Sequence, residues 1–173
     1  GISWSEQNDL NTGRGHPGAA GTQTAALAFG GEEPSNTDKT EKYDGTSWTE
    51  VNDLNTARGK MGPFGIQTAA MAAGGSSPSF VDNVESYDGT NRTEIADLNT
   101  ARGELAGAGI QTSGLAVGGD TSPANSADTE LWNGTSWTEV ANLNTARRNI
   151  WATGTTDYNS ALACAGKSGT TNQ

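Results

Sequence analysis

Four residues of different chemistry stand at one position of a repeated phrase. The phrase Leu-Asn-Thr-(Ala/Gly)-Arg begins at Leu10, Leu54, Leu98 and Leu143, at intervals of 44, 44 and 45 residues. Two residues after the arginine of each copy stand His16, Lys60, Glu104 and Asn149. An imidazole, an ammonium, a carboxylate and an amide on one constant framework are suited to hydrogen-bonding a polar ligand. We therefore predict that these four residues bind a ligand. Drift in unconstrained loops is the alternative.

The arginine of the phrase does not vary. It occurs as Arg14, Arg58, Arg102 and Arg147, each preceded by an asparagine at 11, 55, 99 and 144. Its guanidinium carries five donors in a rigid fork and can satisfy loop carbonyls. An identical side chain in every copy favours a structural role that ties one unit to the next, and direct contact with a ligand is the alternative.

The sequence has few residues that could form a metal site or a disulfide. His16 and Cys164 are the only residues of their types, which argues against structural zinc and leaves no intrachain disulfide. We predict no metal and no cofactor, and we expect Cys164 to be a buried small residue. Acidic residues follow the Gly-Gly pairs and indicate a solvated acidic rim, with a Ca²⁺ site as the alternative: Glu32, Glu33, Asp38, Asp82, Glu85, Asp120, Asp128 and Glu130.

Composition and charge narrow the function classes. The chain has 173 residues, 10 Lys plus Arg against 20 Asp plus Glu, and a net charge of −10. An acidic surface repels phosphate, which argues against nucleic-acid binding. Apolar runs are only a few residues long, so no membrane span is predicted. Because the chain begins at Gly1 without a leader-like segment, we interpret it as a processed product or an excerpt. Few large aliphatic residues usually indicate disorder, but the repeat favours a folded chain.

Each unit of about 44 residues divides into four short strands. In the second unit we expect them at 62–66, 68–73, 84–87 and 91–98. Asp44-Gly45 and Asn133-Gly134 predict type I′ hairpins between the third and fourth strands. Trp48, Val51 and Leu54 are spaced by three, which we interpret as a bulged strand rather than a helix.

The pattern resembles the kelch repeat of β-propellers, including the galactose-oxidase-like central domain. The resemblance rests on a Gly-Gly pair after a small apolar strand, then Tyr43, Trp48 and Arg58, with Trp132, Trp137 and Arg147 in the third copy. It implies an all-β propeller of four-stranded antiparallel blades. It also implies structural roles for Gly30, Gly31, Gly74, Gly75, Gly118, Gly119, Trp4, Trp48 and Trp137. Trp48 and Trp137 should be buried between blades, with Arg92 in the same slot of its blade.

We expect one propeller segment over 1–173. Its repeats are 16–54, 61–98 and 105–143, with a partial blade from 149–173 plus 3–10. The strand count leaves one blade incomplete. The ring is therefore a four-bladed one with a gap, a ring shared by two chains, or part of a larger protein. We expect self-association through the termini, in a two-chain ring or a head-to-tail array.

The resemblance is specific for fold and nearly silent on function. The Asn/Thr/Gly-rich sequence of the repeats also resembles repeats of environmental phage and bacterial surface proteins. We predict a non-catalytic binding or structural propeller of a virion or cell-surface appendage, extracellular, that recognises a glycan or a neighbouring protein subunit. The alternatives are a fragment of a galactose-oxidase-like or sialidase-like enzyme and an intracellular kelch scaffold.

Overall fold

The computed structural model describes residues 3–154, 158–169 and 171–172, and its regular structure is β-strand apart from one 3₁₀ turn. Three antiparallel sheets of four strands follow one another along the chain. The first holds β1 (Gly18–Thr22), β2 (Ala25–Phe29), β3 (Thr40–Tyr43) and β4 (Trp48–Val51). The second holds β5 (Gly62–Ile66), β6 (Ala69–Ala73), β7 (Val84–Tyr87) and β8 (Arg92–Glu94). The third holds β9 (Ala106–Ile110), β10 (Ser113–Asp120), β11 (Asn125–Trp132) and β12 (Trp137–Glu139). The all-β prediction is therefore confirmed.

The fourth repeat is partial. Strand β13 (Trp151–Thr153) pairs with β14 (Leu162–Cys164), and η1 (Tyr158–Ser160) lies between them in the sequence. Strands β15 (Lys167–Ser168) and β16 (Thr171–Asn172) form a separate small pair. Residues 3–10 contain no strand. They contact the first sheet, where Asn8 Nδ2 donates to Thr46 O at 2.8 Å. Whether 3–10 joins the partial unit stays a prediction.

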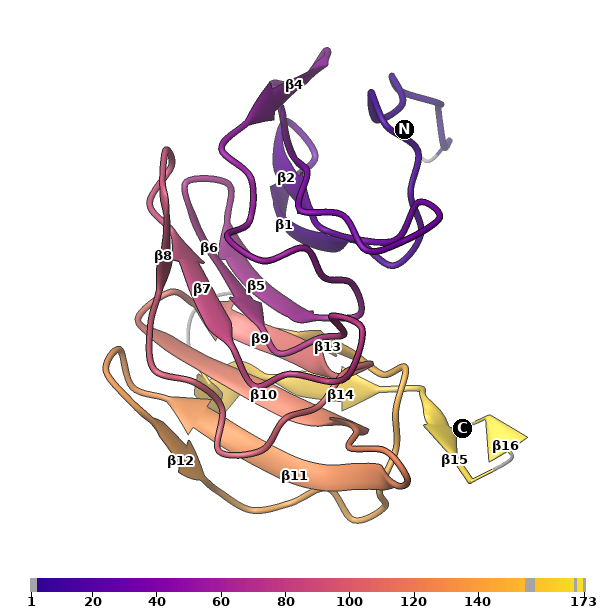
Figure 1. The fold of residues 1–173 in the computed structure, drawn as a ribbon, viewed down its shortest axis with the longest axis vertical. Coiled ribbons are helices and arrows are strands. Elements are labelled where there is room, and N and C mark those ends of the chain that lie inside the picture. Colours follow the sequence, from indigo (N-terminus) through magenta and orange to yellow (C-terminus); the bar gives the residue numbers. More distant parts are fainter. Residues whose placement is uncertain (1–2, 155–157, 170, 173) are drawn as a thin grey trace.

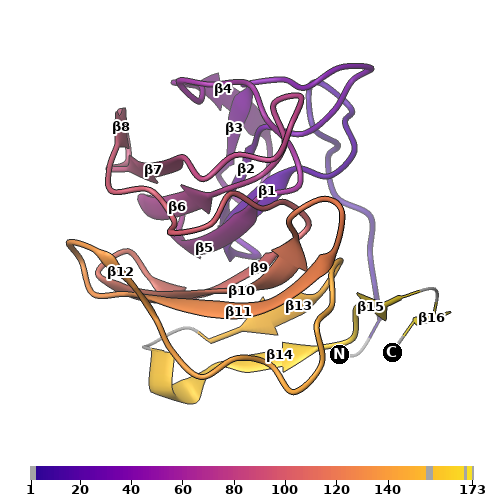
Figure 2. The same ribbon diagram turned by 60° about the horizontal axis from the view of Figure 1, so that its bottom comes forward.

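The sheets fan out from their first strands. In Figure 1, β1, β5, β9 and β13 lie near the middle of the molecule, whereas β4, β8 and β12 lie on its outer side. Figure 2 shows the same order from a second direction. Each first strand contacts the first strand of the next unit. Small residues permit this approach, because a Cβ at Gly107 would lie 2.6 Å from Pro63 O.

The third and fourth strands of each unit are joined by a four-residue loop, so the predicted type I′ turn is wrong. Tyr43 pairs directly with Trp48. Asp44 Oδ1 accepts hydrogen bonds from the backbone N–H groups of Thr46 and Ser47, both at 2.8 Å. Gly45 alone in this loop has positive φ, at 96°. The aspartate side chain therefore closes the turn that we had assigned to the backbone.

Trp48, Arg92 and Trp137 begin the fourth strands of the three sheets, at equivalent positions that we call the aromatic slot. The surroundings of the slot differ from sheet to sheet. Trp137 is buried, with its ring edge-on to Phe64 of the preceding sheet at 6.3 Å between centroids. Arg92 is also buried, and its guanidinium carbon lies 4.5 Å from the ring centroid of Phe29. Trp48 is only half-buried, because residues 3–10 rather than a sheet lie beside it. The expected burial of Trp48 between blades is therefore wrong.

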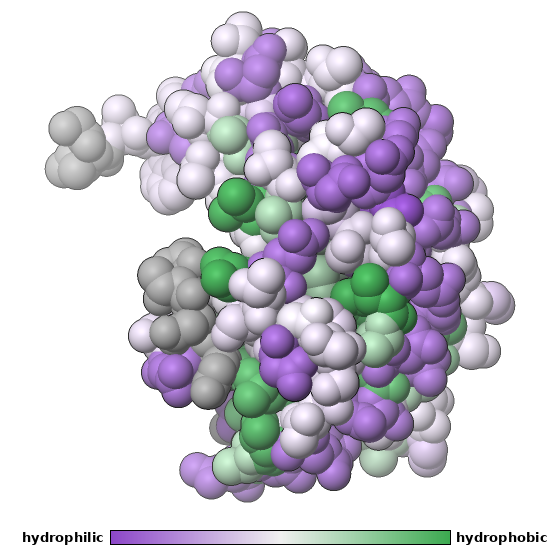
Figure 3. Space-filling view, turned by 90° about the vertical axis from the view of Figure 1, so that its left-hand side faces the viewer, coloured by the Kyte–Doolittle hydropathy of each residue, from purple (hydrophilic) through white to green (hydrophobic). Residues whose placement is uncertain are grey.

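The exposure of Cys164 and Trp4 and the hydropathy of the outer strands describe the surface of the molecule. Cys164 is exposed, contrary to expectation, because no third strand covers β14 within the described part of the chain. Trp4 is fully exposed. Hydrophilic residues dominate the outer side of the fan, with scattered apolar groups (Figure 3). No helix among the described residues is long and apolar enough to cross a membrane.

Candidate binding site

The four variable residues share one unusual backbone conformation. His16, Lys60, Glu104 and Asn149 have φ of 49°, 59°, 56° and 51°. This left-handed region is costly for residues with a Cβ, and glycine is the residue that adopts it freely. Each unit nevertheless has a polar side chain there. Backbone strain of this kind is concentrated at functional sites, which gives a physical reason to regard the position as a site.

A chain of backbone hydrogen bonds runs through this position from unit to unit. Lys60 N donates to His16 O at 3.2 Å, and Glu104 N donates to Lys60 O at 2.8 Å. Asn149 N continues the chain to Glu104 O at 2.9 Å. The backbone here connects neighbouring sheets in a way that does not depend on side-chain identity. The side chains are consequently free to differ.

The four side chains line a single pocket of about 580 Å³. Its apolar walls come from the residues that begin the first strands, including Pro17, Met61, Pro63, Leu105, Ile150 and Trp151. Trp151 is 76% exposed and presents a large aromatic surface. The residues that we predicted as one ligand-binding set are thus brought together, from four units, around one concave surface.

Glu32 connects two of the four residues. Its Oε2 lies 3.2 Å from His16 Nδ1, and its Oε1 lies 3.2 Å from Lys60 Nζ. Partial burial acts to raise the pKa of Glu32, but the hydrogen bonds and positive charges of Lys60 and His16 together outweigh it and lower this pKa below its usual value. Glu32 is therefore ionised at neutral pH and acts as a hydrogen-bond acceptor.

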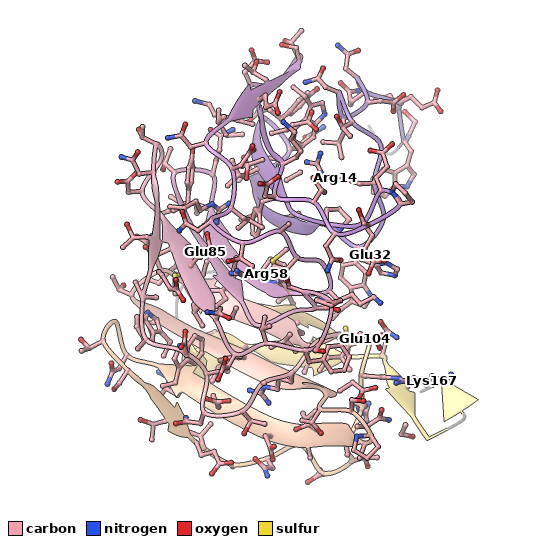
Figure 4. All side chains as sticks on the ribbon, viewed as in Figure 1. Arg14, Glu32, Arg58, Glu85, Glu104 and Lys167 are labelled. Atoms are coloured by element: carbon pink, nitrogen blue, oxygen red, sulfur yellow. The ribbon has the colours of Figure 1, made fainter. Side chains whose placement is uncertain are left out.

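Glu104 organises the other side of the pocket. Its Oε2 accepts a hydrogen bond from Asn149 Nδ2 at 3.0 Å and lies 3.5 Å from Arg148 Nε. Arg148 also forms an ion pair with Asp120. Figure 4 shows Glu32 and Glu104 on the inner, right-hand side of the fan. The pocket is therefore rimmed by alternating donors and acceptors whose geometry is held by ion pairs.

Glu32 is not poised to donate a proton as a general acid. A general acid needs a pKa raised toward neutrality, and the pKa of Glu32 is shifted the other way. Among the described residues, no group of three or more His, Cys, Asp or Glu side chains could hold a metal ion. An aromatic face beside polar groups can bind a ligand through stacking and hydrogen bonds.

Three of the repeated arginines, at 14, 58 and 102, each form a buried ion pair with a glutamate, which we call the arginine clamp. Arg58 Nη1 donates to Glu85 Oε1 at 2.6 Å, and Arg58 Nη2 donates to Ala72 O at 3.2 Å. Arg102 and Glu130 form the same pair at 3.0 Å. Figure 4 shows Arg58 beside Glu85 within the fan.

Each of these three arginines pairs with a glutamate in the third strand of the sheet that follows it in the sequence. Arg14 pairs with Glu41 at 2.7 Å, so all three complete units contain the clamp. Glu85, Asp120 and Glu130 are buried, and the solvated acidic rim is therefore wrong for these three residues. Our sequence reasoning missed the pair, although a glutamate recurs 27 or 28 residues after each of the first three arginines. Arg147 bonds instead to the carbonyls of Thr145 and Ala165.

The Gly-Gly pairs hydrogen-bond to the backbone of the repeated arginines. Gly30 and Gly31 have φ of 61° and 110°, and Gly31 N donates to Arg58 O at 2.9 Å. The two later pairs repeat this conformation and this hydrogen bond, at Gly74, Gly75, Gly118 and Gly119. A Cβ at Gly31 would lie 2.7 Å from Gly15 O. These glycines hold backbone against backbone.

Comparisons with known proteins found no matching family model, and no curated protein matches the chain.

Proposed function

We propose that this chain is a non-catalytic recognition module, a segment of a kelch-type β-propeller that binds a glycan in the pocket lined by His16, Lys60, Glu104 and Asn149. The observation that carries the proposal is the retention of four different polar side chains at a backbone position where glycine would be less strained. A position kept only for structure would not require them.

Glycan is favoured over a protein subunit because of the composition of the pocket. A sugar ring has an apolar face that stacks on an aromatic side chain and hydroxyls that need both donors and acceptors. Trp151 supplies the aromatic surface, and Glu104 and Asn149 supply the two kinds of polar group. A cell-surface or virion appendage, outside the cell, is the setting that fits such a module best.

An oligosaccharide array tests the proposal. The full chain should be labelled and applied to mannose-, galactose-, N-acetylglucosamine- and sialic-acid-terminated oligosaccharides. We expect at least one class to bind. Titration of that class should then change the tryptophan fluorescence of the chain. The absence of binding by every class at millimolar oligosaccharide would contradict the proposal.

Two tryptophan variants provide a matched pair. Trp151→Ala should lower the affinity at least tenfold, because it removes the stacking surface. Trp4→Ala should leave the affinity unchanged, since Trp4 is also an exposed tryptophan but does not line the pocket. Equal losses in both variants would show that the binding is not located in this pocket.

A further inference from the structure

The loop between β11 and β12 contains an Asn-Gly pair, and no other asparagine of the chain is followed by glycine. Asn133 and Gly134, which form the pair, are both exposed. The equivalent loops of the first two sheets have Asp44 and Asp88 instead, each also followed by glycine. The third sheet therefore has a carboxamide at the position where the other two have a carboxylate.

The backbone of this loop supplies donors to the side-chain carbonyl of Asn133. The N–H groups of Thr135 and Ser136 both donate to Asn133 Oδ1, each at 2.9 Å. A nucleophile that attacks the side-chain carbon Cγ converts Oδ1 into an oxyanion. Two backbone N–H groups at this distance stabilise such an oxyanion. The loop thus forms an oxyanion hole around its own asparagine.

The backbone nitrogen of Gly134 is the nucleophile that can reach Asn133 Cγ, because its attack closes a five-membered ring. Among the described residues, the Gly134 N–H donates to no partner, so no hydrogen bond has to break when its proton is lost. Glycine also has no side chain to hinder the approach of its nitrogen. The loop therefore presents an unhindered nucleophile next to a polarised carbonyl.

Ser136 is placed beside the group that would leave. Asn133 Nδ2 donates to Ser136 Oγ at 3.4 Å. A hydroxyl both accepts and donates, so Ser136 can pass a proton from water to Nδ2 as the Cγ–Nδ2 bond breaks. The equivalent residue is Ser47 in the first sheet, but it is Asn91, which has no hydroxyl, in the second.

We propose that Asn133 is a site of self-catalysed deamidation in the folded chain. Hydroxide removes the amide proton of Gly134, the nitrogen bonds to Asn133 Cγ, and ammonia leaves with the proton relayed by Ser136. Water then opens the resulting succinimide at one of its two carbonyl carbons and leaves an aspartyl or an isoaspartyl residue. The net reaction consumes one water and releases one ammonia, with no oxidant or reductant.

The aspartyl product would have the loop structure of the first two sheets. Asp44 and Asp88 accept the same two backbone hydrogen bonds, at 2.7 or 2.8 Å. These backbone N–H groups lower the pKa of both carboxyl groups, because they stabilise the ionised form. The loop therefore suits a carboxylate, and deamidation would add one negative charge to the third sheet.

Peptide mapping by mass spectrometry tests the proposal on the full chain. After incubation at mildly alkaline pH, we expect the mass change from amide to acid at Asn133 before any other asparagine, with release of an equal amount of ammonia. Ser136→Ala should slow this change at least about tenfold. Ser47→Ala is the matched control, since it removes the same hydroxyl from the first sheet and should leave the rate at Asn133 unchanged.

Two transplanted sites separate the effect of the loop geometry from that of the sequence. Asp44→Asn and Asp88→Asn each create an Asn-Gly-Thr sequence, the first beside Ser47 and the second beside Asn91. We expect the first site to deamidate about as fast as Asn133 and the second clearly more slowly, whereas in denaturant the rates should become equal. An unreactive Asn133 in the folded chain, equal rates at the two introduced sites, or no slowing by Ser136→Ala would each overturn the proposal.

Discussion

Two positions, two residues apart in every unit, follow opposite rules. The first is always arginine, and Arg58 and Arg102 are fully buried. The second is His16, Lys60, Glu104 or Asn149, and its side chain lies around the pocket. Both positions join neighbouring units. The arginine joins them through its side chain, which explains why the same residue type stands in every unit. The variable residue joins them through its backbone, so its side chain can differ from unit to unit.

The largest expected effect is at the arginine position. Arg102→Ala leaves Glu130 buried without its cation, and we expect a loss of about 3–5 kcal/mol of unfolding free energy. Chemical denaturation followed by circular dichroism measures it. The double replacement Arg102→Met with Glu130→Leu removes both charges and should recover most of that loss. A single variant within about 1 kcal/mol of the unmodified chain would show that the clamp is not structural.

The aromatic slot sharpens the contrast between buried and open copies. Trp137→Ala should cost about 3–5 kcal/mol, because Trp137 is buried against the preceding sheet. Trp48→Ala should cost clearly less, since the Trp48 ring is half-buried and stacks mainly on Tyr43. Denaturant midpoints of the two variants should therefore differ. Equal losses would mean that the first sheet is covered in solution.

Arg92 occupies the aromatic slot of the second sheet at a cost in stability. All three of its guanidinium nitrogens are buried without a hydrogen-bond partner, and burial lowers the pKa of Arg92 to about 10, partly opposed by the charge of Glu85. The side chain therefore stays charged between Phe29 and Tyr87. Arg92→Trp should stabilise the chain by about 1–3 kcal/mol, the cost of such unsatisfied groups. A lower melting temperature would instead indicate overpacking against Phe29.

The variable position should respond weakly in stability and strongly in binding. Lys60→Gly removes an ion pair with Glu32 but relieves the left-handed backbone, and we expect a net change within about 1 kcal/mol. Glycan affinity should fall, because the pocket loses a donor. A large loss of stability with unchanged binding would reverse our assignment of roles.

The smallest effect concerns pH. The pKa of Glu32 lies below its usual value of 4.5, so its ionised form stabilises the folded chain above that pH. This contribution is lost as the pH falls through the lowered pKa. Because the groups are partly exposed, we expect less than about 1 kcal/mol. Glu32→Gln should flatten the stability profile between about pH 5 and pH 3 relative to the unmodified chain.

Most of the strands could be predicted from the sequence of the repeat. The expected strands at 62–66 and 84–87 agree with β5 and β7, because apolar alternation and turn residues are local signals. The turn at Asp44 was mistaken because an Asp-Gly pair fits both a two-residue and a four-residue loop. The clamp at Arg58 was missed because its partner lies 27 residues away, in a strand that local patterns do not orient.

The sequence by itself determined the repeat, the four-strand unit and the set of residues that differ between units. These follow from spacing and from residue type, which are local properties. Only the tertiary structure decided that the variable residues share one pocket, that Glu85 is buried rather than solvated, and that Cys164 is exposed. Each of these depends on which unit lies beside which. Identical local sequence can be buried in one unit and open in another, because burial depends on the neighbour that the fold supplies.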